Sequence, residues 1–205
     1  MMPRRHLLSS MEGSALRGIF IFFRRKEMIE KKSFSVRKLV FAAVCLALCM
    51  VLPLITMHIQ AIGNALCPMH IGVLLCGFIC GPWYGLAVGF IAPLLRFALF
   101  GMPPIYPTGL AMCFELAAYG LFAGILYKAL PKNIPMLYVS LICSMLLGRI
   151  VWGLARCALA LFGGVEFSWQ AFVAGGFTTA IPGIILHIVI IPPIVLALKK
   201  AKLAE

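Results

Sequence analysis

The stretch LVFAAVCLALCMVLPLITM, residues 39–57, contains no charged side chain and is almost entirely apolar. At about 1.5 Å per residue, a helix of this length reaches across the roughly 30 Å hydrocarbon core of a bilayer. The stretch therefore predicts a membrane-spanning helix, and similar apolar runs follow it along the chain. We predict spans at 38–57, 68–81, 83–100, 108–129, 135–162 and 169–198, separated by turn residues rich in Gly and Pro.

The composition of the whole chain agrees with this pattern. Of its 205 residues, 63% are hydrophobic and 12% are charged, and the mean hydropathy is +1.06. Soluble domains are about half apolar and about a quarter charged, so this chain has too little polar surface to cover itself in water. We predict an all-α integral membrane protein, a bundle of six transmembrane helices that forms one membrane domain.

The net charge of +12 is concentrated at the two ends of the chain. Lysines and arginines crowd the region before the first span and follow the last one, where they would contact the lipid bilayer. The loops 58–67, 101–107 and 163–168 contain neither residue, whereas the loop 128–134 contains Lys128 and Lys132. This alternation predicts that both termini lie inside the cell, and without a nucleic-acid-binding motif we expect no nucleic-acid partner.

The segment before the membrane domain is basic and weakly patterned. We expect residues 1–36 to form a cytoplasmic N-terminal segment, 37–200 the membrane domain and 201–205 a cytoplasmic tail. The sequence MIEKKSFSVRKLVFAA from Met28 is typical of a membrane protein's start, so residues 1–27 are expected to be an upstream extension from a misassigned start codon.

Eight cysteines occur in or beside the apolar stretches, and no CxxC motif is present. Structural zinc sites use closely spaced ligands of that kind. Cys67-Pro68-Met69-His70 offers soft ligands, but we expect no metal site, and we interpret the cysteines as small packing residues.

Polar residues within the spans are the candidates for a binding site. A charge at mid-membrane costs on the order of 3 kcal/mol, so intramembrane charges usually serve a function or pair with one another. Given the predicted orientation, several polar and aromatic side chains fall at one depth in the outer half of the bundle. Such a cluster predicts a small-molecule pocket that opens outward. The candidate substrate-binding residues are Arg96, Glu115, Arg156, Trp152, Asn64, Tyr106 and Thr178.

Structural interpretations of these residues stay open. Glu115 could neutralise Arg96 or Arg149 and so tie helices together. Arg156 could extend toward the outer headgroups, and Tyr106 could belong to an interfacial aromatic belt. His187, alone on an apolar helix, is expected to be a hydrogen-bonded packing residue.

Small residues at a spacing of four indicate close approach between helices. Ala43 and Ala47 form one such face on the first span, and Gly81, Gly85 and Gly89 form another at the start of the third. Either face could serve packing within the bundle or contact with a partner.

The order of these motifs resembles the substrate-binding S components of energy-coupling factor (ECF) transporters over roughly residues 36–200. The likeness rests on Ala43 and Ala47 within FAAVCLALCM, and on MHIGVLLCGFICGPWYG with its Gly81-Pro82 corner. It rests also on IYPTGLAMCFELAAYGLFAGILY, residues 105–127. The resemblance implies a multi-pass protein of the bacterial cytoplasmic membrane that takes up a vitamin or related micronutrient.

The resemblance also implies partners. The chain would bind its vitamin from outside and dock through Ala43 and Ala47 onto an EcfT-type transmembrane coupling protein, which carries two cytoplasmic ATPases. It would then topple in the membrane to release its cargo inward. Because the sequence has no Walker A motif, GxxxxGK[ST], we expect partner ATPases to use the ATP and this chain to bind no cofactor.

The predicted spans contain two or three arginines but only one acid, which leaves a surplus of positive charge. The arginine guanidinium binds a carboxylate through two parallel hydrogen bonds. This surplus favours a carboxylate-bearing vitamin such as pantothenate, with a flavin, folate or pyrimidine-like compound as alternatives. A membrane enzyme is disfavoured because clustered acids and a GxSG-like nucleophile are missing. The remaining alternative is an autonomous secondary carrier or a structural membrane subunit that needs no ATPase.

Overall fold

The structure is a computed structural model that describes residues 36–54, 66–163 and 181–201. The chain divides into two compact units, Met1–Lys38 and Leu39–Glu205. Of the first unit only residues 36–38 are described, and the packing reported below lies within the second. The predicted upstream extension, residues 1–27, lies outside the described residues, and the predicted domain boundaries stay a prediction.

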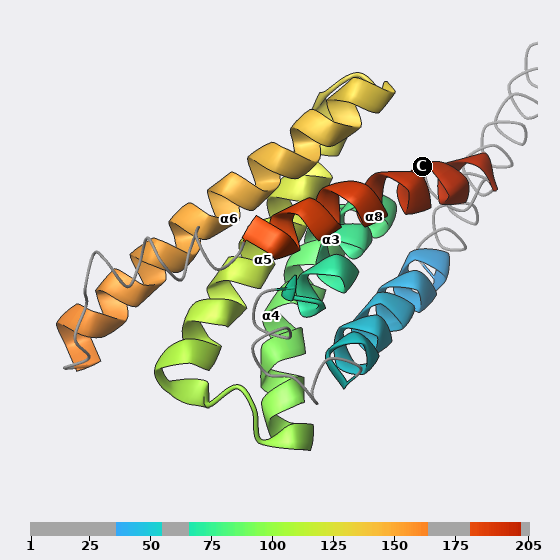
Figure 1. Cartoon of the computed structure of the whole chain (residues 1–205). Coiled ribbons are helices and arrows are strands. Elements are labelled where there is room, and N and C mark those ends of the chain that lie inside the picture. Colours follow the sequence, from blue (N-terminus) through green and yellow to red (C-terminus); the bar gives the residue numbers. More distant parts are fainter. Residues whose placement is uncertain (1–35, 55–65, 164–180, 202–205) are drawn as a thin grey trace, which may run out of the picture. The chain divides into compact units, whose positions relative to one another are not determined.

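The regular elements within the described ranges are helices (Figure 1). Five of these are long and apolar enough to cross a membrane, and the twelve-residue helix α3 is shorter. The elements are the helix Val36–Leu54, α3 (Met69–Cys80), α4 (Pro82–Phe100), the π-helical turn η1 (Ile105–Gly109), α5 (Leu110–Ala129), α6 (Ile134–Gly163) and α8 (Ile181–Lys200).

These bounds agree closely with the predicted spans inside the described ranges. Residues 55–57 of the first predicted span and 169–180 of the last lie outside those ranges. The fourth span begins differently, because η1 precedes α5: the backbone N–H of Gly109 donates to the carbonyl of Pro104 at 2.8 Å. The count of six spans and the orientation of the termini stay predictions.

Glycines end two helices where the sequence predicts breaks. Gly81, with φ of 101°, ends α3, and Pro82 then occupies the first turn of α4. Glycine adopts this backbone without a steric penalty, and proline suits a position whose N–H needs no helical partner. Gly101, with φ of 69°, ends α4 in the same left-handed region.

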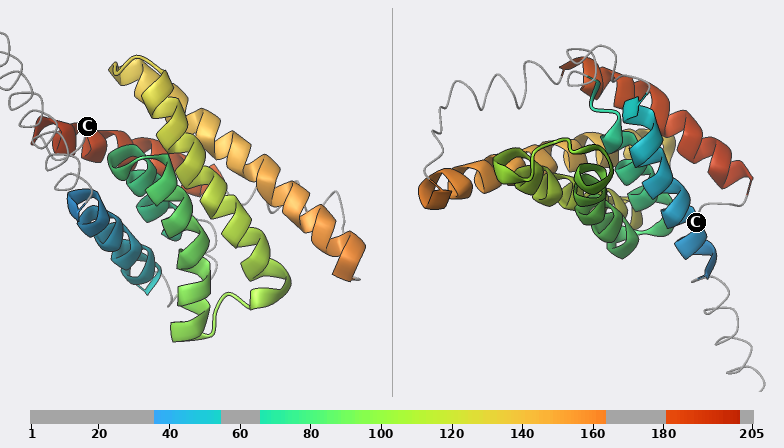
Figure 2. Two further views of the ribbon diagram at one scale, coloured as in Figure 1. Left: turned by 180° about the vertical axis from the view of Figure 1, so that it is seen from behind. Right: turned by 90° about the horizontal axis from the view of Figure 1, so that it is seen from below.

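Helix α5 is the centre of the packing and contacts α3, α4 and α6 (Figures 1 and 2). A methyl group added at Gly85 of α4 would lie 2.5 Å from the carbonyl oxygen of Gly120 of α5, and Gly89 approaches the backbone of Leu116 as closely. The small-residue face at the start of α4 therefore serves packing within the bundle, one of the two predicted uses.

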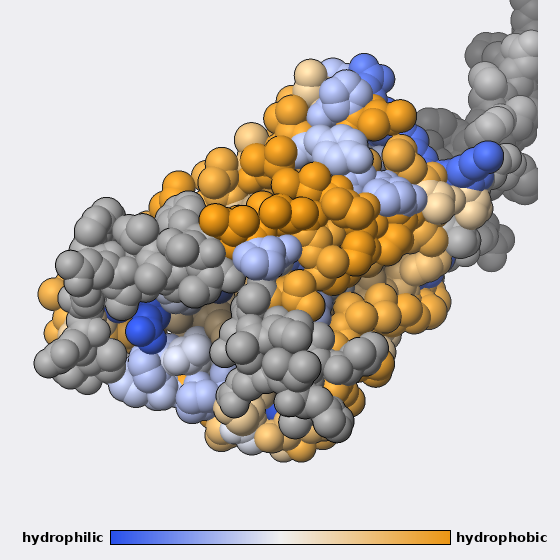
Figure 3. All heavy atoms as spheres, viewed as in Figure 1, coloured by the Kyte–Doolittle hydropathy of each residue, from blue (hydrophilic) through white to orange (hydrophobic). Residues whose placement is uncertain are grey.

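The helix Val36–Leu54 has two different faces. Ala42, Cys45 and Cys49 are buried, and the Cys49 thiol donates to the carbonyl of Met69 at 3.3 Å. Ala43 and Ala47 are exposed on the other side. The surface of the described residues is largely hydrophobic on the face seen in Figure 3, with hydrophilic residues in separate patches. Such a surface suits the lipid phase.

Candidate functional site

A buried polar cluster lies where α3, α5, α6 and α8 approach one another. Helix α5 contributes Glu115 and, one turn later on the same face, Tyr119. Helix α6 contributes Arg149, and α3 contributes His70. Glu115 is only 2% exposed. Four-helix convergence of this kind brings together residues that are far apart in the sequence.

Glu115 forms the electrostatic centre of this cluster. Its Oε1 lies 2.9 Å from Nη1 of Arg149 and 3.5 Å from Nε2 of His70. Of the two arginines that the sequence offered as partners, the structure pairs Glu115 with Arg149 rather than Arg96. The pair is nearly neutral as a unit, which lowers the cost of placing both charges in an apolar bundle.

The histidines keep hydrogen-bonding capacity that the described residues do not use. The ring of His70 lies edge-on to Tyr119 at 5.1 Å between centroids, and 6.0 Å from the ring of His187 on α8. Among the described residues, Nδ1 of His70 and both nitrogens of His187 lack a hydrogen-bond partner. Water cannot easily replace that partner at His187, because this residue is only 2% exposed. Buried polar atoms are normally satisfied, so such groups point to a partner that completes the site.

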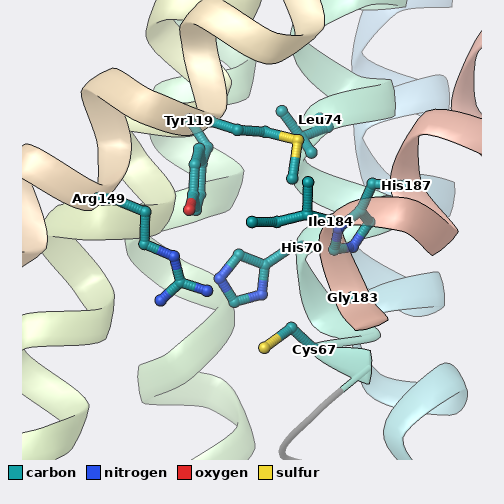
Figure 4. A pocket seen from close by; sticks show the side chains of 9 residues that line it. Cys67, His70, Leu74, Tyr119, Arg149, Gly183, Ile184 and His187 are labelled. Carbon is teal, nitrogen blue, oxygen red and sulfur yellow. The ribbon is translucent and has the colours of Figure 1, made fainter. Parts of the chain in front are cut away.

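These side chains line a crevice that Figure 4 shows from close by. Arg149, Tyr119 and His70 point into one space, and His187 enters it from α8. The crevice is narrower than a water molecule in this structure. Its lining residues Cys67 and Gly183 stand two and three residues from the segments 55–65 and 164–180, which lie outside the described ranges. Burial raises the pKa of the Cys67 thiol above its ordinary value.

A second group lies along η1 and the later part of α6. The Arg156 guanidinium lies 6.0 Å from the centre of the Trp152 ring, as their spacing of four residues predicts. The Tyr106 hydroxyl donates to the carbonyl of Leu159, one turn further, at 3.3 Å. Arg96 of α4 has a buried Nη1 without a hydrogen-bond partner among the described residues. Within the described ranges, neither Arg96 nor Arg156 forms a recorded ion pair with Glu115, the one acidic residue there.

The predicted site residues thus fall into distinct places. Glu115 belongs to the crevice, whereas Tyr106, Trp152 and Arg156 form the group on η1 and α6. Asn64 and Thr178 lie outside the described residues. Sequence reasoning did not select His70, Tyr119, Arg149 or His187 as contacts. Tyr119 could have been found from its spacing to Glu115, whereas the meeting of His70 and His187 depends on how α3 packs on α8.

His187 is buried, as expected, but its nitrogens make no hydrogen bond within the described part of the chain. His187 therefore differs from the hydrogen-bonded packing residue that the sequence predicted.

No group of three or more His, Cys, Asp or Glu side chains in the described ranges could hold a metal ion.

Comparison with known proteins places this arrangement in a family. A family model described as "ECF transporter, substrate-specific component" matches residues 37–195, well over half of the chain. No curated protein and no solved structure matches the chain.

Proposed function

The chain belongs to the ECF transporter substrate-specific components, and from this membership we propose that it imports a vitamin or related micronutrient. It is a multi-pass membrane protein and the substrate-binding subunit of an ECF transporter, a transport subunit rather than an enzyme. In the proposed function, binding has high affinity and ATP drives the uptake.

The buried polar crevice is the observation that carries the assignment of the binding region. Imidazole nitrogens of His70 and His187 without partners can accept and donate hydrogen bonds to a small polar molecule, and Tyr119 adds an aromatic wall. Because the crevice has no room for a water molecule, binding requires the helices that line it to move apart. Asn64 and Thr178, which lie outside the described residues, remain proposed contacts.

A carboxylate-bearing vitamin such as pantothenate remains the proposed substrate class. Glu115 neutralises Arg149, whereas Arg96 and Arg156 have no recorded acidic partner among the described residues. A guanidinium of this kind can bind a carboxylate through two parallel hydrogen bonds. Arg156 and Trp152 together could hold a carboxylate and an apolar group of one substrate.

The proposed assembly places this chain against an EcfT-type coupling protein with two cytoplasmic ATPases. Ala43 and Ala47 are exposed, so their face is free for a close helix–helix contact. We propose that the chain lies in the bacterial cytoplasmic membrane with both termini on the cytoplasmic side. Partner ATPases use the ATP, and this chain binds no cofactor.

Mass spectrometry of small molecules released from the detergent-purified protein tests the binding function. Protein expressed in rich medium should release one vitamin-like compound in stoichiometric amount, compared with empty membranes. His187→Leu should lower its occupancy about tenfold, because a buried hydrogen bond to ligand is worth roughly 1.5 kcal/mol. Ser144→Ala is the matched control: Ser144 is buried on α6, bonds within its own helix and does not line the crevice. Equal loss in both variants, or no enriched compound, would contradict the proposal.

The alternative function is an autonomous secondary carrier, for which Glu115 is the candidate proton-coupling group. Its burial between Arg149 and His70 is the observation that favours this possibility. Uptake into vesicles that contain this chain without ATPases would support the carrier, whereas uptake that depends on the ATPases would exclude it.

A further inference from the structure

A second cleft lies away from the polar crevice, where α3 ends, α4 begins and α5 ends. It measures about 290 Å³, counted out to its open side. Its floor is apolar and buried: Phe78 of α3 packs edge-on against Tyr127 of α5, with 5.4 Å between the ring centres. Gly77, Gly81 and Gly124 also line the cleft and contribute no side chains to it. Three packed helices build the floor of the cleft, and the loop between α5 and α6 adds Lys132 to its rim.

Lysines form the rim of this cleft. Lys128 and Lys132 both line it and are exposed. A methyl group added at Gly81 would lie 3.4 Å from Nζ of Lys128, so this ammonium group covers the Gly81 corner. A third ammonium lies close by, because Nζ of Lys199 donates to the carbonyl of Lys132 at 3.4 Å.

No carboxylate in the described ranges balances these charges. Glu115 is the one acidic residue there, and it is paired with Arg149 in the other site. Two ammonium groups on the rim and a third bonded to the Lys132 carbonyl, with no described acid paired to them, favour an anionic ligand. Ammonium groups bind phosphate oxygens through charge-assisted hydrogen bonds.

The position of the cleft along the spans indicates which anion would reach it. The candidate span Pro82–Phe100 begins directly after Gly81, and Ile105–Ala129 ends one residue after Lys128. Trp83, on the first turn of α4, is 76% exposed, as is typical of residues at the level of lipid headgroups. Ile125, three residues before Lys128 on α5, is 44% exposed and offers apolar surface on the same helix. An occupant with a phosphate and an apolar tail matches both features.

We propose that this cleft binds the phosphate group of an anionic phospholipid, with Lys128 and Lys132 as its ligands and the acyl chains along the exposed face of α5. The site is independent of the vitamin-binding function. A free phosphate ion shares the same ligands but makes no use of Ile125.

Native mass spectrometry of the purified full chain with added phosphatidylglycerol or phosphatidylcholine tests this proposal. The wild-type protein should retain phosphatidylglycerol preferentially. Lys128→Gln should weaken its retention about fivefold, the contribution of one lysine near an anionic lipid, and Lys128→Arg should restore it. Lys200→Gln removes the same charge from an exposed position that does not line the cleft, and it should change retention less than twofold.

Three results would overturn the proposal. Equal retention of the two lipids would show that the anionic headgroup is not recognised. Equal losses in Lys128→Gln and Lys200→Gln would show that diffuse surface charge attracts the lipid. Displacement of phosphatidylglycerol by millimolar inorganic phosphate would assign the cleft to a free anion instead.

Discussion

Replacement of Glu115 by Gln tests whether the buried ion pair stabilises the bundle. The substitution keeps the shape of the side chain and an acceptor oxygen but removes the charge that faces Arg149. At the observed 2.9 Å, Coulomb's law gives about 6 kcal/mol of attraction at an effective dielectric constant of roughly 20. Because the arginine is left buried without its counter-charge, we expect a net loss near the lower end of the roughly 3–5 kcal/mol typical of broken buried pairs.

The chain provides its own probe for this measurement. Its eight cysteines are free, and Cys45, Cys49, Cys76, Cys80 and Cys113 are buried. A thiol-reactive fluorophore therefore reports unfolding in detergent as these thiols become accessible. For a chain of this size, a loss of about 3 kcal/mol corresponds to a midpoint roughly 6–12 °C lower.

Two further variants decide whether the loss belongs to the pair. Arg156→Gln removes a half-buried charge with no recorded acidic partner, and its midpoint should fall by less than about 3 °C. Glu115→Leu combined with Arg149→Met removes both charges and should recover most of the stability, because an apolar replacement of a buried pair is often neutral. A midpoint for Glu115→Gln within about 2 °C of wild type would refute the reasoning. A double variant whose loss equals the sum of the losses of Glu115→Leu and Arg149→Met alone would also refute it.

Other substitutions have equally specific outcomes. Gly120→Ala places a methyl group against the backbone of Gly85 and should lower the free energy of unfolding by about 3 kcal/mol. Gly101→Ala meets open space and should cost only about 1–2 kcal/mol of backbone strain. The same thermal assay compares the two variants. Ala43→Leu or Ala47→Leu should abolish ATP-driven uptake and leave ligand binding unchanged, and unimpaired uptake would exclude docking through this face. Tyr106→Phe should cost less than about 1 kcal/mol, since its bond to the Leu159 carbonyl is exposed, and a larger loss would indicate a closer contact.

The sequence predicted the helical class and most helix bounds because these depend on local properties. Apolar runs long enough to span a bilayer and turns such as Gly81-Pro82 need no tertiary information. The spacing of four residues likewise predicted that Trp152 and Arg156 share a face, and their contact confirms it. The start of the fourth span was less accurate, because the η1 turn depends on a backbone bond from Gly109 to Pro104.

The candidate site was predictable in part. An acid in an apolar span is costly wherever it packs, and this cost singled out Glu115 from the sequence alone. Its partner was ambiguous between Arg96 and Arg149, because both lie on other helices and helix rotation decides which one points inward. His187 was expected to be a packing residue, since nothing in its own helix shows that α8 faces His70 of α3.

The sequence by itself thus determined that this is a helical membrane protein with charged ends and one buried acid, because hydropathy and charge act on each segment separately. Only the tertiary structure decided that Glu115 pairs with Arg149, that His70 and His187 meet in one crevice, and that Lys128 and Lys132 surround a second cleft. These contacts join residues on different helices. Their distances follow from how closely glycines such as Gly85 and Gly120 let the backbones approach, which no single segment specifies.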